Sequence, residues 1–230
     1  MSLTATGMCT RSCLDFVATN LSDAEITGLS VIEVGALDVN GSARSLVKAL
    51  NPGSYLGVDM QAGPGVGEIC PAEKLIEKFG ENRFDVVLTT EMLEHVFDWR
   101  TVLHNLKGIL KPGGLLLVTT RSIGFGYHAY PYDFWRYQVE DMKTLFDDFQ
   151  ILNLVDDPLS PGVFVKARKP ANFTENDLTQ VALHSMITSR RSLNVTEKEI
   201  SSFHFCRRLT QPFRSIEKGL RRIRDMILRK

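Results

Sequence analysis

The sequence predicts an α/β protein in which a doubly wound, mostly parallel sheet is covered by helices on both faces. Two observations predict this fold. Between residues 29 and 168, short apolar segments of strand length alternate with segments of helical periodicity. Turn residues such as Pro, Gly and Asn separate these segments. We expect seven strands, of which the last two form an antiparallel hairpin.

The first half of this region contains two expected strands and two expected helices. Residues 29–34 and 54–60 are short apolar runs that are typical of buried strands. Residues 42–50 between them have helical spacing, which ends at Pro52 because proline cannot continue a helix. Residues 72–79 form the second helix, with apolar residues on one face.

The second half completes the expected sheet. Residues 84–90 leave no polar face, so we expect a central strand that is buried on both sides. Residues 98–110 carry apolar side chains at helical spacing, and a Lys-Pro-Gly-Gly turn ends this helix before the strand at residues 115–120. Residues 149–157 and 162–169 are the expected strands of the hairpin.

The expected strands divide the chain into a domain and an extension. The last of them ends near Pro170, so we expect one domain over residues 1–170, with a helical lead-in over residues 1–28. Residues 171–230 are then a helical, basic extension.

Charge is unevenly distributed along a chain that is neutral as a whole. Residues 190–230 contain 12 Lys or Arg and 4 Asp or Glu, a net charge of +8, and residues 1–189 carry −8. From Phe213 to Ile227, apolar residues recur at helical spacing with basic residues between them, which predicts a basic amphipathic helix. This helix folds back on the acidic body, lies on an anionic membrane, or contacts nucleic acid. We expect no nucleic-acid partner, because no basic patch surrounds the expected site.

Composition excludes several classes of protein. No apolar run reaches the ~18 residues that are needed to span a bilayer. The first residues lack the basic start, apolar stretch and cleavage site of a signal peptide, so we expect a cytoplasmic protein, with membrane association only through the extension. The cysteines are scattered, and we expect ordinary thiols rather than zinc ligands at Cys9, Cys13, Cys70 and Cys206.

Two strand ends carry residues that suit a nucleotide cofactor. Gly35 and Gly41 follow the first strand, where small residues let the backbone approach a ligand. Asp59 ends the second strand, where a carboxylate can accept hydrogen bonds from both ribose hydroxyls. Glu33, beside the glycine turn, would repel a pyrophosphate, so the pattern favours a cofactor that bears an ammonium group.

These residues belong to a longer pattern. Glu33-x-Gly35, Asp59, the segment TTEMLEH at residues 89–95 and the turn LKPGG resemble the class I S-adenosylmethionine-dependent methyltransferases over residues 29–168. Within that superfamily, the sequence of these segments is similar to that of the small-molecule group called the type 11 methyltransferases. The resemblance implies a Rossmann-like fold, S-adenosylmethionine as the cofactor and methyl transfer as the activity.

The resemblance also implies contacts with the cofactor from the strand ends and from residues 70–73, a segment that follows the third strand in the family and precedes the strand at residues 84–90. The expected contact residues are Glu33, Gly35, Ala36, Gly41, Asp59, Met60, Ala72, Glu73, Thr90 and Glu91. It implies that Glu33 supports the amino end of the methionine part and that Asp59 holds the ribose. Ala72 and Glu73 would lie near the adenine, with Met60 packed on its face.

Two departures from the family pattern concern the glycine turn and the adenine loop. Leu37 and Val39 stand where the family often has glycine, so the turn must be wider. We expect Asp38, Asn40 and Gly41 to make an alternative turn, since Asn and Gly tolerate left-handed backbone. Pro71 stands where many relatives have an aspartate that contacts the adenine.

Methylation of an oxygen requires a base that removes the hydroxyl proton. His95 follows the fourth strand and is a candidate base, the alternative being a residue that only packs or caps; His128 is the second candidate catalytic residue. Helical spacing would place Glu91, Glu94 and His95 on one face. That text is similar to the metal-binding segment of ubiquinone-pathway O-methyltransferases and small-RNA 2′-O-methyltransferases, in which a later histidine, here His128, completes the shell. Many relatives carry it without metal, and we expect none.

Aromatic residues are concentrated between residues 125 and 137, after the fifth strand. We expect this segment to bind the acceptor through Tyr130, Tyr132, Trp135 and Arg136. It resembles the HxxPxDxW text of methyltransferases encoded with polysaccharide-building enzymes, which implies that the acceptor is a saccharide or another small-metabolite hydroxyl. RNA 2′-O-methylation with a divalent metal and a noncatalytic binding protein remain as alternatives. The absence of Asn/Asp-Pro-Pro-Tyr after the fourth strand argues against amino methylation of DNA bases.

Overall fold

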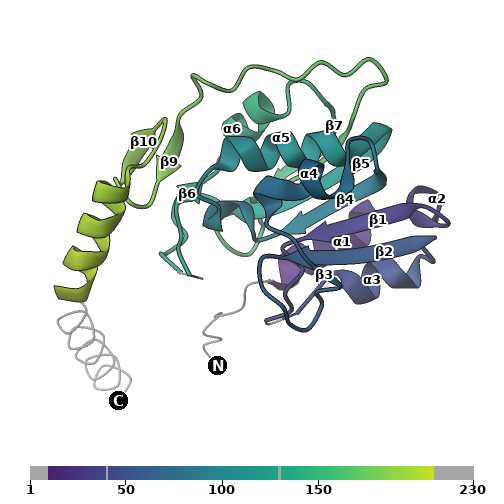
Figure 1. The fold of residues 1–230 in the computed structure, drawn as a ribbon, viewed down its shortest axis with the longest axis horizontal. Coiled ribbons are helices and arrows are strands. Elements are labelled where there is room, and N and C mark those ends of the chain that lie inside the picture. The colour runs from purple at the N-terminus through teal and green to yellow at the C-terminus, as the bar shows by residue number, and fades with distance from the viewer. Residues whose placement is uncertain (1–9, 40, 129–130, 210–230) are drawn as a thin grey trace.

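A seven-stranded sheet with helices on both faces forms the body of the molecule (Figure 1). The computed structural model describes residues 10–39, 41–128 and 131–209. The strand order is β3-β2-β1-β4-β5-β8-β7. The order reverses beside β1, and in doubly wound sheets ligands bind at the carboxyl ends of the strands at such a point.

The sheet confirms the predicted fold class. Its strands are β1 (Ser30–Val34), β2 (Ser54–Asp59), β3 (Glu68–Ile69), β4 (Phe84–Thr90), β5 (Leu110–Arg121), β7 (Gln150–Asp156) and β8 (Gly162–Arg168). The first five pair in parallel. β8 pairs antiparallel with both β5 and β7, so the expected hairpin is present.

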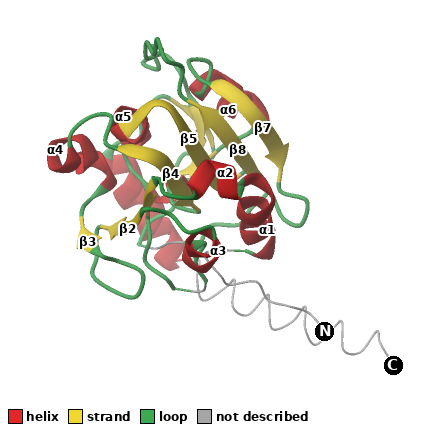
Figure 2. Cartoon of the chain, turned by 90° about the vertical axis from the view of Figure 1, so that its right-hand side faces the viewer, coloured by secondary structure: helices red, strands yellow, loops and turns green. Residues whose placement is uncertain are grey.

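Two groups of helices enclose the sheet, which lies between them in Figure 2. One face is covered by α1 (Arg11–Asn20), α2 (Asp23–Ile26) and α3 (Arg44–Ala49), and the other by α4 (Leu75–Phe79), α5 (Trp99–Ile109) and α6 (Val139–Leu145). Two single-turn 3-10 helices, η1 (Ala72–Lys74) and η2 (Leu93–His95), follow β3 and β4.

The central strand β4 shows why this sheet is buried on both faces. Val86 and Leu88 pack with the α1, α2 and α3 side, whereas Val87 packs with the α5 and α6 side, and all three side chains are fully buried. Successive residues of a strand point to opposite faces of the sheet, so an uninterrupted apolar run contributes side chains to both cores. The expectation for residues 84–90 is therefore confirmed.

The described part of the extension is not wholly helical, which corrects the expectation for residues 171–230. It contains β9 (Leu183–Ser185) and β10 (Arg190–Ser192), which form a second sheet with β6 (Trp135–Arg136) in the order β10-β9-β6. These strands form because the short β6 offers an edge that β9 can pair with. A helix then runs from residue 197 to residue 209.

Buried polar contacts attach the extension to the main domain. Arg100 on α5 donates hydrogen bonds to the backbone oxygens of Leu178, Val181 and Leu193. The buried Lys107 donates to Asn176 (3.1 Å) as well as forming an ion pair with Asp148. The predicted basic amphipathic helix at residues 213–227 lies outside the described residues. Within the described part of the chain, no helix is long and apolar enough to cross a bilayer.

Candidate active site

A cavity of about 570 Å³ opens at the carboxyl ends of β1, β2 and β4. Its first wall comes from strand ends and from the loops that follow them: Val34, Gly35, Leu37, Asp59, Met60, Gln61, Cys70, Pro71, Ala72, Glu73, Glu91 and Met92. Its second wall comes from later segments: His95, Val96, Phe97, Pro131, Tyr132, Phe134, Glu197, Ile200 and Ser201. The structure thus brings together segments that are more than 150 residues apart in sequence.

Gly35 occupies the sharp turn between β1 and the cavity. Its backbone has φ = +79°, and its amide and that of Ala36 both donate to the carbonyl oxygen of Val58 (2.9 and 3.0 Å). A Cβ atom at position 35 would lie 2.7 Å from the side chain of Met92. Both the left-handed backbone and the close approach require glycine.

Asp59 ends β2 at the edge of the cavity, as the sequence predicts. Its carboxylate accepts hydrogen bonds from the backbone amides of Leu37 (3.3 Å) and Gln61 (3.1 Å), one on each oxygen. These bonds fix the orientation of the carboxylate and leave each oxygen a further lone pair for a ligand. Leu37, which replaces a family glycine, contributes both this amide and part of the cavity wall.

Glu33 lies behind the cavity rather than in it. Its side chain is 1% exposed and accepts a hydrogen bond from the hydroxyl of Tyr55. Burial raises the pKa of Glu33 to about 7, against the opposing effects of Tyr55 and Arg44. Of the other expected cofactor residues, Ala36, Gly41 and Thr90 are also absent from the cavity wall, whereas the remaining six line it. Gly41 instead donates its amide to the side chain of Asp38 (2.8 Å), as the alternative turn requires, and Asn40 lies outside the described residues.

Glu91 is separated from the other acidic residue of its segment, which corrects the expectation of one shared helical face. Glu91 has φ = +55° and precedes the single turn of η2, so no regular helix joins it to Glu94. Its carboxylate forms an ion pair with the buried Arg121, which also contacts Asp157 (3.2 Å). Glu91 therefore lines the cavity with its charge already balanced.

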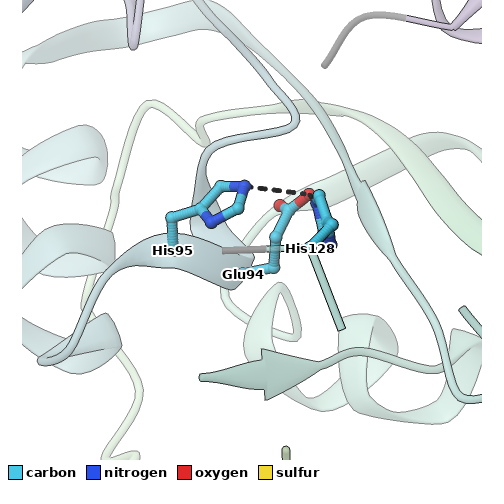
Figure 3. A group of neighbouring side chains, drawn as sticks. All are labelled: Glu94, His95 and His128. Atoms are coloured by element: carbon cyan, nitrogen blue, oxygen red, sulfur yellow. Dashed lines mark ion pairs between the residues drawn. The ribbon is translucent and has the colours of Figure 1, made fainter. Parts of the chain in front are cut away.

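Three side chains converge beside the cavity: Glu94, His95 and His128 (Figure 3). One donor atom from each lies within 4.8 Å of the others. Glu94 Oε1 is 4.0 Å from His95 Nε2 and 3.6 Å from His128 Nε2. Glu94 and His95 belong to η2, whereas His128 comes from the loop after β5.

Surrounding groups orient each member of this cluster. His95 Nδ1 lies 2.6 Å from the carbonyl oxygen of Tyr132, so Nδ1 carries the hydrogen and Nε2 offers a lone pair. Thr120 donates to Glu94 Oε2 (2.9 Å), and His128 Nδ1 lies 3.0 Å from Asp133 Oδ2. Glu94 Oε1 and His95 Nε2 are buried without a hydrogen-bond partner among the described residues. Two of the three groups thus present atoms without a hydrogen-bond partner within 4.8 Å of one another.

The charges of the cluster follow from these contacts. Burial lowers the pKa of His128, but the hydrogen bond to Asp133 and the nearby carboxylate of Glu94 outweigh burial and raise it to about 9. Burial opposes ionisation of Glu94, but the adjacent His128 and His95 imidazoles lower its pKa. Two imidazole nitrogens and one carboxylate oxygen are also a donor set that suits a divalent cation such as Zn²⁺. Surrounding groups that orient each ligand are typical of such sites.

The acceptor residues predicted from the sequence divide into three groups. Tyr132 lines the cavity, together with Phe97 and Phe134. Trp135 and Arg136 do not line it, which corrects the expectation for both: Trp135 is buried and donates its Nε1 hydrogen to the carbonyl oxygen of Phe97 (3.2 Å). Tyr130 lies outside the described residues.

Arg136 has a structural environment. Its guanidinium is fully buried, forms an ion pair with Asp133, and also donates to the carbonyl oxygens of Phe125 and Gly126. The aromatic segment therefore supplies both core and cavity wall. Among the wall residues not expected from the sequence, Glu197, Ile200 and Ser201 belong to the extension, and no local pattern marks them.

Comparisons with known proteins match this architecture. The sequence model of the family described as "Methyltransferase domain" matches residues 10–156, which is more than half of the chain. The fold is similar to a solved methyltransferase from Burkholderia thailandensis, with S-adenosylhomocysteine and 1,6-didemethyltoxoflavin bound (TM-score 0.54, 17% identity, 68% of this chain and 78% of that one). It is also similar to an S-adenosylmethionine-dependent methyltransferase from Mesorhizobium loti (TM-score 0.55, 17% identity, 71% of this chain and 100% of that one).

Curated relatives match a shorter region. The mitochondrial ubiquinone biosynthesis O-methyltransferase of Homo sapiens is 32% identical over 93 residues, 40% of this chain and 23% of that protein. The enzyme of the same name from Caulobacter vibrioides is 34% identical over 82 residues, 36% of this chain and 30% of that protein. The chain thus spans less than a third of the length of these two relatives.

Proposed function

The chain belongs to the methyltransferase domain family, and from this premise we propose that it transfers the methyl group of S-adenosylmethionine to a hydroxyl oxygen of a small acceptor. The observation that carries the proposal is one continuous cavity that joins the Gly35 and Asp59 strand ends to the His95 imidazole. A methyl donor at one end and an acceptor at the other would meet within it. The curated relatives support oxygen as the methylated atom, because their names describe O-methyltransferases.

The cofactor is proposed to occupy the wall formed by the strand ends. Asp59 would accept hydrogen bonds from the ribose hydroxyls, with its carboxylate held by backbone amides. Gly35 would lie under the methionine part, where the missing side chain leaves room. The exposed Met60 would pack on the adenine, with Ala72 and Glu73 at its edge. Such a placement agrees with the general position of ligands in doubly wound sheets.

Four expected contact residues lie outside this wall, and we propose supporting roles for them. Glu33 would hold the end of β1 through Tyr55 rather than touch the methionine part. Ala36 and Gly41 would shape the turn after β1, and Thr90 the end of β4. In each of these roles the residue would hold the backbone of a strand end or turn in place, and neighbouring residues would contact the cofactor.

His95 is proposed as the base. In the reaction, the acceptor oxygen forms a bond to the methyl carbon as the carbon–sulfur bond breaks, and S-adenosylhomocysteine leaves. The hydroxyl proton must move to a base, and His95 Nε2 carries a lone pair because Nδ1 donates to Tyr132. His95 also lines the cavity, as a base in contact with the acceptor must.

His128 is proposed as a partner of His95 rather than as a second base. The contacts to Asp133 and Glu94 raise its pKa to about 9, so near neutral pH both ring nitrogens carry hydrogen and neither can accept the proton of the acceptor hydroxyl. Its positive charge would stabilise the negative charge that develops on the acceptor oxygen. We retain both histidines as candidate catalytic residues, with different roles.

A second candidate, favoured by the convergence of Glu94, His95 and His128, is methyl transfer assisted by a divalent cation. These three residues would hold the ion, and a bound cation would lower the pKa of an acceptor hydroxyl. Metal analysis of protein purified without chelator, followed by calorimetric titration with Zn²⁺ and Mg²⁺, separates the two candidates. Binding that is lost in Glu94→Gln and kept in Glu175→Gln supports the cation. Full activity in excess chelator contradicts it.

The acceptor is proposed to be a small molecule with a hydroxyl group. Aromatic side chains at Phe97, Tyr132 and Phe134 suit a flat ring or the apolar face of a saccharide. RNA 2′-O-methylation is the less favoured form of the same chemistry. A binding protein without catalysis is the remaining alternative from a different class.

The experiment that tests the function begins with binding of S-adenosylhomocysteine by calorimetry. We expect binding that is weakened at least about tenfold by Asp59→Ala and unchanged by Asp15→Ala, an exposed carboxylate on α1. Transfer of labelled methyl from S-adenosylmethionine to phenols, saccharides and a short RNA then identifies the acceptor class. No binding at millimolar ligand would overturn the proposal. Binding without transfer to any hydroxyl would favour the noncatalytic alternative.

A further inference from the structure

The outer wall of the cavity comes from the helix at residues 197–209, which the family match does not reach. Glu197, Ile200 and Ser201 line the cavity, whereas the match ends at residue 156. This helix lies beyond β10 at one end of the molecule (Figure 1). Any recognition that it provides is therefore a property of this chain and not of the family domain.

Specific contacts hold the helix in place. Its first turn is closed by Thr196 and Glu199, which exchange hydrogen bonds in a capping box. Farther along, the ring of Phe203 lies 5.2 Å from that of Tyr127, and His204 lies 5.3 Å from Tyr132. Tyr127 and Tyr132 belong to the loop that carries His128. The helix is thus fixed against the acceptor side of the cavity.

The charged groups that line the cavity are nearly all acidic. Four carboxylates line it, at Asp59, Glu73, Glu91 and Glu197, and among the described residues no lysine or arginine does. Asp59 and Glu73 belong to the wall proposed for the cofactor, and Arg121 balances Glu91. Glu197 is thus the carboxylate of the acceptor wall.

No cationic side chain pairs with Glu197 among the described residues, and only the start of its helix partly offsets its charge. The residue is exposed, and no hydrogen bond or ion pair is found for it within the described part of the chain. Its neighbours in the second wall include the apolar side chains of Ile200 and Phe97. The cations Arg190 and Lys198, close to the first turn of the helix, do not line the cavity; nor does Arg207, which lies over the ring of Tyr127 at 4.0 Å. A carboxylate beside an apolar surface repels anions more strongly than one in open water.

We propose that Glu197 is a specificity-determining residue that restricts the acceptor to neutral or cationic molecules with an apolar or aromatic body. It disfavours acceptors that carry a carboxylate or phosphate near the reacting hydroxyl. The proposal rests on the proposed function, because it assigns the second wall to the acceptor. It extends that function by naming the charge class that the cavity accepts.

The first test measures the charge preference of the cavity without requiring a known acceptor. Phe97→Cys places a thiol on the wall that is formed by a different segment, in a parent with Cys9 and Cys206 replaced by serine. The thiol is reacted with a cationic and an anionic methanethiosulfonate of similar size, and the ratio of rates is measured. The parent without the new thiol reports any reaction at Cys70, which also lines the cavity.

The measured ratio is the rate with the cationic reagent divided by the rate with the anionic one. We expect this ratio to be at least about threefold higher for the thiol at position 97 than for a free thiol in solution. Glu197→Gln should lower the ratio most of the way to the value for a free thiol, and Glu197→Lys should lower it below that value. Lys198→Gln, one residue along the same helix but outside the wall, should not lower it. A ratio that Glu197→Gln leaves unchanged overturns the proposal. Circular dichroism confirms that each variant folds.

A second test uses methyl transfer to three catechols that differ in charge: 3,4-dihydroxybenzylamine, 4-methylcatechol and 3,4-dihydroxybenzoate. We expect the KM for the benzoate to be the highest and to fall several-fold in Glu197→Gln while kcat changes little. An unchanged KM for the benzoate contradicts the proposal. If none of the three is methylated, catechols are excluded as acceptors for the proposed function, and the ratio of thiol rates still decides the role of Glu197.

Discussion

The Nδ1 atom of His95 lies 2.6 Å from the carbonyl oxygen of Tyr132. This contact joins the turn after β4 to the loop after β5, which are 37 residues apart. It also fixes the tautomer of His95, because a carbonyl oxygen can only accept a hydrogen bond. The position of the acceptor loop and the basic nitrogen of His95 are therefore coupled.

Replacement of His95 should affect turnover far more than cofactor binding. We expect His95→Ala to lower kcat by about 10²- to 10⁴-fold, the usual contribution of a general base, and to leave the Kd for S-adenosylhomocysteine within about threefold. His104→Ala is the control, because His104 is exposed and pairs with Glu175 away from the cavity. Normal turnover in His95→Ala would remove His95 from the mechanism.

The strained turn at Gly35 should be measurable against a matched glycine. Gly28 has φ = +75°, close to the +79° of Gly35, but a Cβ atom at Gly28 meets nothing within 4 Å. We expect Gly28→Ala to cost about 1 kcal/mol of folding free energy and to leave ligand affinity unchanged. Gly35→Ala should cost a similar folding free energy and should in addition lower the affinity for S-adenosylhomocysteine at least about tenfold, because the new methyl group displaces Met92. Equal ligand affinity in both variants would show that the contact with Met92 has no consequence.

The raised pKa of Glu33 predicts how stability changes with pH. In the folded protein the pKa of Glu33 is about 7, whereas in the unfolded chain this carboxyl has its ordinary pKa of 4.5. The folded state thus binds more protons between these values, so its stability falls as pH rises from about 4.5 to 7, by roughly 3 kcal/mol. Glu33→Gln should remove this decline in urea titrations from pH 5 to pH 8. The same decline in Glu33→Gln, with exposed Glu77→Gln as the control, would contradict the assignment.

Asp133 and Arg136 should behave as a buried ion pair rather than as acceptor-binding residues. Removal of one partner leaves the other charge buried, so we expect Asp133→Asn to cost about 3 kcal/mol of unfolding free energy. The double variant Asp133→Asn/Arg136→Gln should recover part of that loss, as denaturant titrations would show. If Arg136→Lys raises the acceptor KM and leaves stability unchanged, the sequence-based interpretation of Arg136 as an acceptor ligand is correct.

The sheet could be predicted from the sequence because each strand and helix carries its own pattern. Apolar runs, helical spacing and the Lys-Pro-Gly-Gly turn identified all but the short β3 among the strands of the large sheet. The small sheet of β6, β9 and β10 was not predicted. Its strands have two or three residues each, which is too few for any periodicity.

The candidate site could be predicted only in part, because sequence position does not fix the direction of a side chain. Asp59 is the last residue of β2 and reaches the cavity, whereas Glu33 lies one residue before the end of β1, where its buried carboxylate pairs with Tyr55. Within the aromatic segment, nothing local separates Tyr132 on the wall from Trp135 in the core. Glu197, Ile200 and Ser201 reach the cavity through tertiary packing, which no short motif encodes.

The two walls of the cavity arise from segments that can change separately during evolution. Substitutions between residues 197 and 201 can alter which molecule is methylated while the turn at Gly35 and the carboxylate of Asp59 keep the same methyl donor. Exchange of the helix at residues 197–209 between related chains could thus change the acceptor without altering the cofactor wall, in nature or by engineering.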